Sequence, residues 1–362
     1  MAPIPHRFLV PLILCRFALG ISWTVIHPYV SDQVASFGVP AASLGFWVGI
    51  IESCLQLAEI FAPILCYISD YTGRKPIFIL SMLLYGWVLI PIGFSTSLFG
   101  VFFWRTMQGF CSVYAILTKA IMAEVTDHSN RGRAFGIMFL AFAVGYVVGP
   151  WVGGHMVKLN RFEALSDVGV LNRYPYLPPS LVVGFCILII ATIVFIYLPE
   201  TLPKEKRKTW GSKQTTGPKE TSMKEEWIKL WHYRPCRNML ILEFLTCAVG
   251  FSWDVSFIVV CASPRPIGPG LMPPEIGNVL LVGAIASGFG AITLFPWMER
   301  NLSRSAILSS TCTAWTITFL TLGMVSWLSN VEEGQEGPSA VVIWFWIILS
   351  NLCKRYADLG VT

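Results

Sequence analysis

The sequence contains few charged residues. Aspartate, glutamate, lysine and arginine together make up 13% of its 362 residues, about half the share of roughly 25% that is usual in soluble domains. Hydrophobic residues make up 54%, and a soluble protein of this size has too little interior to bury so much apolar surface. The shortage of charge therefore argues against an ordinary soluble protein and predicts a chain embedded in lipid.

The sequence also lacks the motifs of several large enzyme classes. It has no phosphate-binding G-x-x-x-x-G-K-[ST] loop, no H-E-x-x-H zinc motif and no nucleophile elbow. The ten cysteines lie mostly inside apolar runs and show no metal-ligand spacing. We interpret them as small packing residues and do not expect a disulfide framework. We therefore expect no enzyme, no cofactor and no metal site.

Long apolar runs recur along the chain. Each is about 20 residues long, the length that an α-helix needs to cross a hydrocarbon core of roughly 30 Å. Membrane-spanning strands are about half as long, so the predicted fold class is an all-α polytopic membrane protein. The first run is too long for a signal peptide and should remain in the membrane. The ten predicted spans are Phe8–Val30, Leu44–Ser69, Ile77–Ser97, Phe99–Glu124, Ala134–Val157, Pro179–Leu198, Met239–Ala262, Ile276–Met298, Ser305–Leu328 and Ala340–Asp358.

The distribution of lysine and arginine predicts the orientation of these spans. With the N-terminus in the cytoplasm, nineteen basic residues fall on the cytoplasmic side and four on the opposite side. The nineteen include Lys354 and Arg355, which interrupt the tenth span. This asymmetry explains the net charge of +5 without a nucleic-acid partner. We predict a six-helix bundle (1–198), a cytoplasmic linker (199–238) with a short amphipathic segment near Glu225–Trp231, and a partial second bundle (239–362).

The most polar stretch of the first hundred residues is Ser69–Pro76, SDYTGRKP, between the second and third spans. Gly73 suits a turn with a positive φ angle, and Pro76 suits the first turn of the following helix. One interpretation is a basic turn that only sets the topology of the neighbouring spans. A second interpretation depends on a family resemblance.

Six spans, a linker and this loop resemble the major facilitator superfamily. The loop matches the family signature after its second helix, G-x-L-a-D-r-x-G-r-k, at Asp70, Gly73, Arg74 and Lys75, although Cys66 and Tyr71 replace its usual glycine and basic residue. Leu198–Leu202, LPETL, matches the ending of the family's first half. The resemblance implies that Asp70, the basic residues of the loop and Glu200 form a charge latch at the cytoplasmic gate.

A second match is Arg105–Gly109, RTMQG, which resembles the family's R-x-x-q-G element in the fourth span. A charge near the middle of a membrane costs at least about 2.5 kcal/mol, so Arg105 needs a partner or a cavity. A spacing of seven residues places Arg105, Ser112 and Lys119 on one helix face. Arg105 and Gln108 are thus candidates for contact with substrate or protons. The alternative is an arginine that snorkels to the membrane surface.

A third match lies in the fifth span, where Gly145–Gly154 resembles the antiporter motif G-x-x-x-G-P-x-x-G-G. Glycines at this spacing allow close approach of a neighbouring helix, and the proline removes a backbone donor and kinks the helix. The resemblance implies a twelve-span drug:proton antiporter of the tetracycline-resistance-like and zinc-induced-facilitator-like branch. The alternative is a generic packing seam. The motif residues are Gly145, Gly149, Pro150, Gly153 and Gly154.

Several ionisable residues inside the spans are candidates to carry protons or substrate. Glu52, Gln56 and Glu59 share one face of the second span. Asp254 lies in the seventh span and Arg16 in the first. We favour Glu52 and Asp254, then Glu59, as proton carriers, with packing or salt bridges such as Arg16 with a glutamate as the alternative. Tryptophans line either a cavity for flat substrates or the interfacial belts; the candidates are Trp23, Trp47, Trp87, Trp151 and Trp253.

The resemblance predicts a complete first half and an incomplete second half of about four helices, where relatives of this branch have six. We expect a C-terminal truncation, with a ten-span variant as the alternative. The predicted function is proton-coupled export of a small organic molecule by a monomer in the lipid bilayer, through alternating access. The residues leave the plasma and vacuolar membranes undecided. The alternative function is a truncated, non-transporting membrane protein.

Overall fold

The computed structural model shows an all-helical protein. The predicted linker, with its amphipathic segment, falls largely outside the residues that the structure describes. The described residues are 6–127, 130–202, 207, 228–229, 231–265, 267–330 and 340–359.

The first half contains six membrane-length stretches of helix. They are joined by short turns, the 3₁₀ helices Leu159–Arg161 and Glu163–Leu165, and the short helices α2 (Val30–Ser36) and α9 (Gly169–Arg173). The main helices are α1 (His6–Thr24), α3 (Ala41–Glu59) continued by α4 (Ala62–Thr72), α5 (Arg74–Phe94), α6 (Leu98–Phe110) followed by α7 (Val113–Val125), α8 (Arg131–Met156) and α10 (Leu177–Tyr197).

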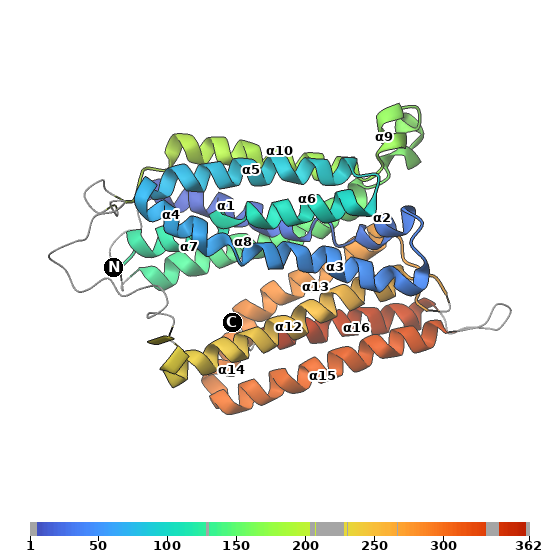
Figure 1. The fold of residues 1–362 in the computed structure, drawn as a ribbon. Coiled ribbons are helices and arrows are strands. Elements are labelled where there is room, and N and C mark those ends of the chain that lie inside the picture. The colour runs from blue at the N-terminus through green and yellow to red at the C-terminus, as the bar shows by residue number, and fades with distance from the viewer. Residues whose placement is uncertain are drawn as a thin grey trace.

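The described part of the second half contributes four more long stretches. These are α12 (Arg234–Ala262), α13 (Pro273–Phe289) with the π-helical segment Gly290–Leu294 and α14 (Phe295–Asn301), α15 (Arg304–Ser329), and α16 (Ala340–Leu359). Figure 1 shows the helices of the first half, blue to lime, lying beside those of the second half, gold to red, with most axes roughly parallel.

Eight helical stretches among the described residues are long and apolar enough to cross a membrane. The two other predicted spans are helical but broken. The span predicted over 99–124 is divided at Cys111–Ser112 into α6 and α7, and the span predicted over 276–298 changes to a π-helix after α13. A broken helix frees backbone groups, which a membrane tolerates where neighbouring protein covers them. The chain is thus a multi-pass integral membrane protein.

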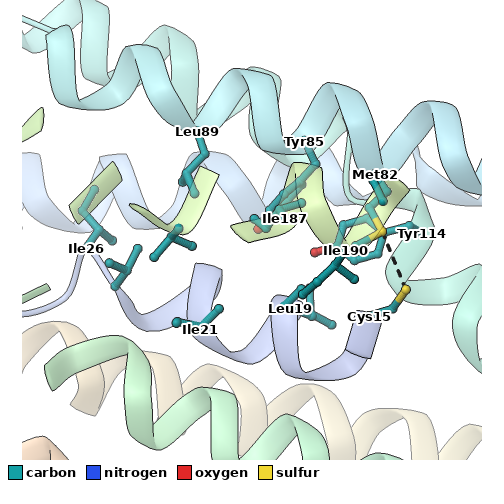
Figure 2. Close-up of a cluster of buried hydrophobic side chains, with 14 of the residues drawn as sticks. Cys15, Leu19, Ile21, Ile26, Met82, Tyr85, Leu89, Tyr114, Ile187 and Ile190 are labelled. Atoms are coloured by element: carbon teal, nitrogen blue, oxygen red, sulfur yellow. Dashed lines mark hydrogen bonds between the residues drawn. The ribbon is translucent and has the colours of Figure 1, made fainter. Parts of the chain in front are cut away.

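The core of the first half lies between α1, α5, α7 and α10. Figure 2 shows Leu19 of α1, Tyr85 of α5 and Ile187 of α10 in this cluster. The Cys15 thiol lies 3.6 Å from the Met82 sulfur. This cysteine fills a small gap between helices, as expected from the sequence. All ten cysteines of the chain are free thiols.

Candidate functional site

A cavity of about 900 Å³ lies between the two halves, and we call it the central groove. Its walls come from α1 and α3 of the first half and from α12 of the second. The lining includes the carboxylates of Glu52 and Asp254 and, within the described part of the chain, no lysine or arginine. The other polar and aromatic lining residues include His27, Gln56, Trp23, Phe46, Phe244 and Phe251.

Glu52 of α3 forms a buried ion pair with Arg105 of α6. The Arg105 Nη2 atom donates to Glu52 Oε2 at 2.6 Å, and its Nη1 atom donates to Gln108 Oε1 at 2.9 Å. Arg105 is 0% exposed, so the alternative of a snorkelling arginine is wrong. His27 Nε2 lies 3.8 Å from the same carboxylate oxygen. Arg105 and Gln108 therefore hold Glu52 from behind and do not line the groove themselves.

A second ion pair lies in the other half. Lys354 Nζ of α16 is 3.3 Å from Asp254 Oδ1 of α12 and 5.7 Å from the centre of the Trp253 ring. The prediction that Lys354 and Arg355 are cytoplasmic and interrupt the tenth span is wrong. Both are buried inside the continuous helix α16, because Asp254 and aromatic rings compensate their charges. Without these two residues the count from the sequence is seventeen basic residues against four, and the orientation stays a prediction.

Arg355 faces the opposite half. Its guanidinium lies 5.2 Å from the centre of the Tyr146 ring on α8. Trp23 of α1 and Phe251 of α12 also meet across the halves, with ring centres 6.1 Å apart. These aromatic contacts join the two halves, whereas each of the two buried ion pairs lies within one half.

Three other predicted residues lie away from the groove lining. Arg16 stacks on the Phe142 ring of α8, with its guanidinium 5.1 Å from the ring centre. Glu59 is partly buried at the end of α3 but does not line the groove. Lys119 is exposed, because the break between α6 and α7 ends the helical register that was expected to align it with Arg105.

The five tryptophans lie in different surroundings, and only Trp23 is part of the groove lining. Trp23 lines the groove, and Trp253 is completely buried, stacked on Phe257 with ring centres 4.6 Å apart. Trp87 and Trp151 are largely exposed, as expected of residues that face lipid. Trp47 is partly buried beside a smaller apolar pocket.

The loop Ser69–Pro76 leads into α5, whose first N–H groups are capped by the carboxylate of Glu200. Gly73 has a φ angle of 108°, a conformation that favours glycine. The backbone N–H of Arg74 donates to Glu200 Oε1 at 2.9 Å, and that of Lys75 donates to Glu200 Oε2 at 3.3 Å. A carboxylate at a helix N-terminus satisfies free N–H groups and meets the positive end of the helix dipole.

Arg74 connects three helices at the same end of the bundle. Its guanidinium lies 2.7 Å from Asp70 on α4 and 3.1 Å from Glu124 on α7. Lys75 Nζ lies 5.5 Å from the centre of the Phe195 ring on α10. All these contacts lie within the first half, so the predicted gate residues Asp70, Arg74, Lys75 and Glu200 form one cluster there.

Replacing Glu200 with alanine is expected to lower the stability of the protein by about 1–2 kcal/mol. The change removes a charged hydrogen-bond acceptor from the first N–H groups of α5. The midpoint of thermal unfolding in detergent measures the effect. The matched control is Glu163→Ala, since Glu163 is an exposed acid outside this cluster. Equal midpoints for the two variants would contradict the capping role.

The predicted antiporter motif lies on α8 and packs tightly against α1. A Cβ atom added at Gly145 would collide with the Phe17 carbonyl oxygen, and one at Gly153 with the Val25 carbonyl oxygen. Gly149 lies against the Thr24 side chain. The two helices therefore approach through their backbones, as the small-residue spacing predicts.

An adjacent face of α8 contacts the second half. A Cβ atom added at Gly154 would lie 2.5 Å from the Pro273 carbonyl oxygen, and one at Gly277 of α13 would lie 2.6 Å from that of Pro150. Helices α8 and α13 are accordingly in extensive contact. The motif thus forms a seam within the first half and a second seam between halves.

A polar cluster holds the end of the bundle opposite to Gly73. Lys158, which has a positive φ angle of 53°, places its Nζ 2.6 Å from Asp32 Oδ2 of α2. The Tyr176 hydroxyl donates to the same oxygen at 3.0 Å. Burial and the Asp32 carboxylate raise the pKa of Tyr176 above its usual value, so its hydroxyl stays protonated as the donor.

Comparison with known proteins identifies the family. The family model of the Major Facilitator Superfamily matches residues 12–353. The chain belongs to the Major Facilitator Superfamily. The superfamily is one of membrane transporters and not of enzymes, which confirms the prediction that the chain is not an enzyme.

Individual relatives of this superfamily member are distant. It is 26% identical over 312 residues to the efflux pump azaK of Aspergillus niger, covering 85% of this chain and 63% of azaK. It is 33% identical over 161 residues to the class H tetracycline resistance protein of Pasteurella multocida, covering 43% of this chain and 40% of that protein. The family match reaches residue 353 and does not support the expected C-terminal truncation.

Solved structures support the superfamily fold. A bacterial homologue of the human lysosomal transporter Spinster, in an inward-facing and unoccupied conformation, aligns with a TM-score of 0.63 at 17% sequence identity. The alignment covers 99% of this chain and 75% of that one. The all-helical fold predicted from the sequence is therefore confirmed.

Sequence reasoning missed three residues of this superfamily member that form the ion pair with Asp254 or the cation–ring contact between the halves. The sequence did not mark Lys354, Arg355 or Tyr146 as candidate site residues. The first two could have been noticed, because they are charged residues inside an apolar run. An intramembrane ion needs a partner, and Asp254 is an acid in another span. That pairing was available as a hypothesis, but only the packing of α12 beside α16 selects it.

Proposed function

We propose that this protein is a proton-coupled carrier that exports a small organic molecule by alternating access. The observation that supports the proposal best is the pair of carboxylates, Glu52 and Asp254, that face one groove from opposite halves. Each carboxylate exchanges protons or polar substrate groups with the groove while a buried cation of its own half balances its charge. In this role the two residues are the proton carriers.

The partition of the ion pairs suits a rocking movement. Glu52 pairs with Arg105 inside the first half, and Asp254 pairs with Lys354 inside the second. One half can therefore turn against the other without separating a buried ion pair, which would be costly. The contacts that must move include Trp23 on Phe251, Arg355 on Tyr146 and the seam between α8 and α13.

The remaining predicted features belong to the same proposal. The Gly73 end of the bundle faces the cytoplasm together with the N-terminus, and the residue ranges 1–198, 199–238 and 239–362 are the first bundle, linker and second bundle. The cluster of Asp70, Arg74 and Glu200 is the gate element, and the α8 seams are the antiporter motif. The carrier works as a monomer.

Transport driven by an imposed pH gradient tests this proposal. The purified chain, reconstituted in proteoliposomes, is expected to accumulate at least one of cationic rhodamine 6G, tetracycline or anionic fluorescein. A protonophore should abolish the accumulation. Glu52→Gln and Asp254→Asn are each expected to reduce the rate at least about tenfold, because a neutral amide cannot carry the proton.

The control for both variants is Glu243→Gln, the same change at an exposed position of α12 outside the groove. It should transport at the wild-type rate. Three results would contradict the proposal: accumulation that a protonophore does not reduce, wild-type transport rates in both groove variants, or no transport of any of the three compounds. The last result would favour a non-transporting membrane protein.

A further inference from the structure

One oxygen of the Glu52 carboxylate lacks a hydrogen-bond donor. Oε2 accepts from Arg105 at 2.6 Å, whereas Oε1 is buried and has no hydrogen-bond partner among the described residues. The whole residue is 6% exposed and lines the groove. Buried carboxylate oxygens are normally satisfied, so this atom indicates a ligand that brings its own N–H or O–H donor.

Each of the two buried ion pairs beside the groove has its negative residue in the groove lining. Arg105 is 0% exposed and Lys354 is 4% exposed, and neither lines the groove. Their partners, Glu52 and Asp254, do. A ligand in the groove is therefore closer to the two carboxylates than to the cations behind them. Because electrostatic interactions strengthen where water is excluded, this arrangement favours a positive charge on the ligand.

Aromatic rings from both halves supply a matching surface. Trp23 and Phe251 meet with ring centres 6.1 Å apart and planes 31° apart. Phe46 of α3 and Phe244 of α12 lie at the rim, 65% and 72% exposed. Aromatic faces attract cations as well as flat apolar groups. The volume of about 900 Å³ is at the upper end of the range for sites of drug-sized ligands.

From these three observations we infer that the central groove selects organic cations: flat aromatic molecules that carry a protonated amine. The amine donates to Glu52 Oε1 and lies near Asp254, and the aromatic body lies against Trp23 and Phe251. This inference deepens the proposed function and uses the same groove, but it concerns the charge of the ligand and not the driving force. Glu52 and Asp254 are then also the residues that determine specificity.

Binding of three naphthalene compounds tests the inference. 2-Naphthylmethylamine, 2-naphthylmethanol and 2-naphthoate share one ring and differ in charge. Their affinities are measured by titration of the full chain in lipid nanodiscs, at pH 7, with empty nanodiscs subtracted. The amine is expected to bind at least about tenfold more tightly than the alcohol or the acid, since a charge-assisted hydrogen bond is about twice as strong as a neutral one.

Variants assign the preference to the carboxylates. Asp254→Asn is expected to reduce the preference for the amine at least about threefold. The double variant Glu52→Gln/Arg105→Gln removes both charges of a pair and so avoids an uncompensated buried arginine. It should remove most of the preference, while Glu243→Gln retains it. Thermal unfolding of each variant confirms that a folded protein is compared.

The outcomes separate this inference from the proposed function. Equal or tighter binding of the acid or the alcohol, or an amine preference that survives in both groove variants, would overturn the inference. Proton-driven transport of anionic fluorescein, without transport of rhodamine 6G or tetracycline, would leave the proposed function intact and would overturn the inference about ligand charge. Selective amine binding without any transport would support the inference and refute the proton-coupled carrier.

Discussion

Replacing Arg105 with leucine is expected to destabilise the protein by about 3–5 kcal/mol. Arg105 is fully buried, and its guanidinium is 2.6 Å from Glu52. Without it, the Glu52 carboxylate stays in the interior with no counter-charge, which is the costly way to break a buried pair. The midpoint of thermal unfolding and the monodisperse fraction after detergent extraction measure the effect.

A double variant identifies the cause of this loss. In Glu52→Gln/Arg105→Leu no unpaired charge remains, so we expect it to be more stable than Arg105→Leu alone. A double-mutant cycle measures this recovery as an interaction energy between the two residues, which is expected for residues in contact. If Arg105→Leu is as stable as the wild type, or if removing Glu52 brings no recovery, the ion pair does not organise this part of the core.

Replacing Gly145 with alanine is expected to separate α1 from α8 and to cost about 1–3 kcal/mol or more. The new Cβ atom would collide with the Phe17 carbonyl oxygen. The colliding atom belongs to the backbone of a helix, so a change of rotamer cannot relieve the contact. Thermal unfolding of the variant in detergent measures the loss.

Gly136 provides a matched control on the same helix. It is exposed, and a Cβ atom added there would meet nothing within 4 Å. Gly136→Ala should leave the stability unchanged or raise it slightly, because alanine is the better helix former. Similar losses at both positions would mean that the collision between α1 and α8 does not explain the loss at Gly145.

Much of the architecture could be predicted because the membrane imposes simple requirements. A helix must be about 20 apolar residues long to cross it, so composition and run length placed the spans closely. The span over 99–124 was nevertheless predicted as one helix. Its apolar pattern continues through Cys111–Ser112, and only the structure shows that the helix is divided there.

The candidate site could be predicted only in part. Glu52 and Asp254 were identified because an acid inside a span is expensive and therefore suggests a function. Their ion pairs were not predicted, because sequence spacing relates residues on one helix and does not relate Glu52 to Arg105 or Asp254 to Lys354. The same limit explains why Lys354 and Arg355 were assigned to the cytoplasmic surface.

The sequence by itself determined that the chain is a helical membrane protein, and its local motifs indicated the family. Hydropathy and glycine spacing are local properties, which nearby residues along the chain are enough to establish. The tertiary structure decided which charges neutralise one another, and that two carboxylates face one groove with their cations behind them. Those facts depend on helices far apart in the sequence, brought together by packing, and the proposed charge selectivity follows from them.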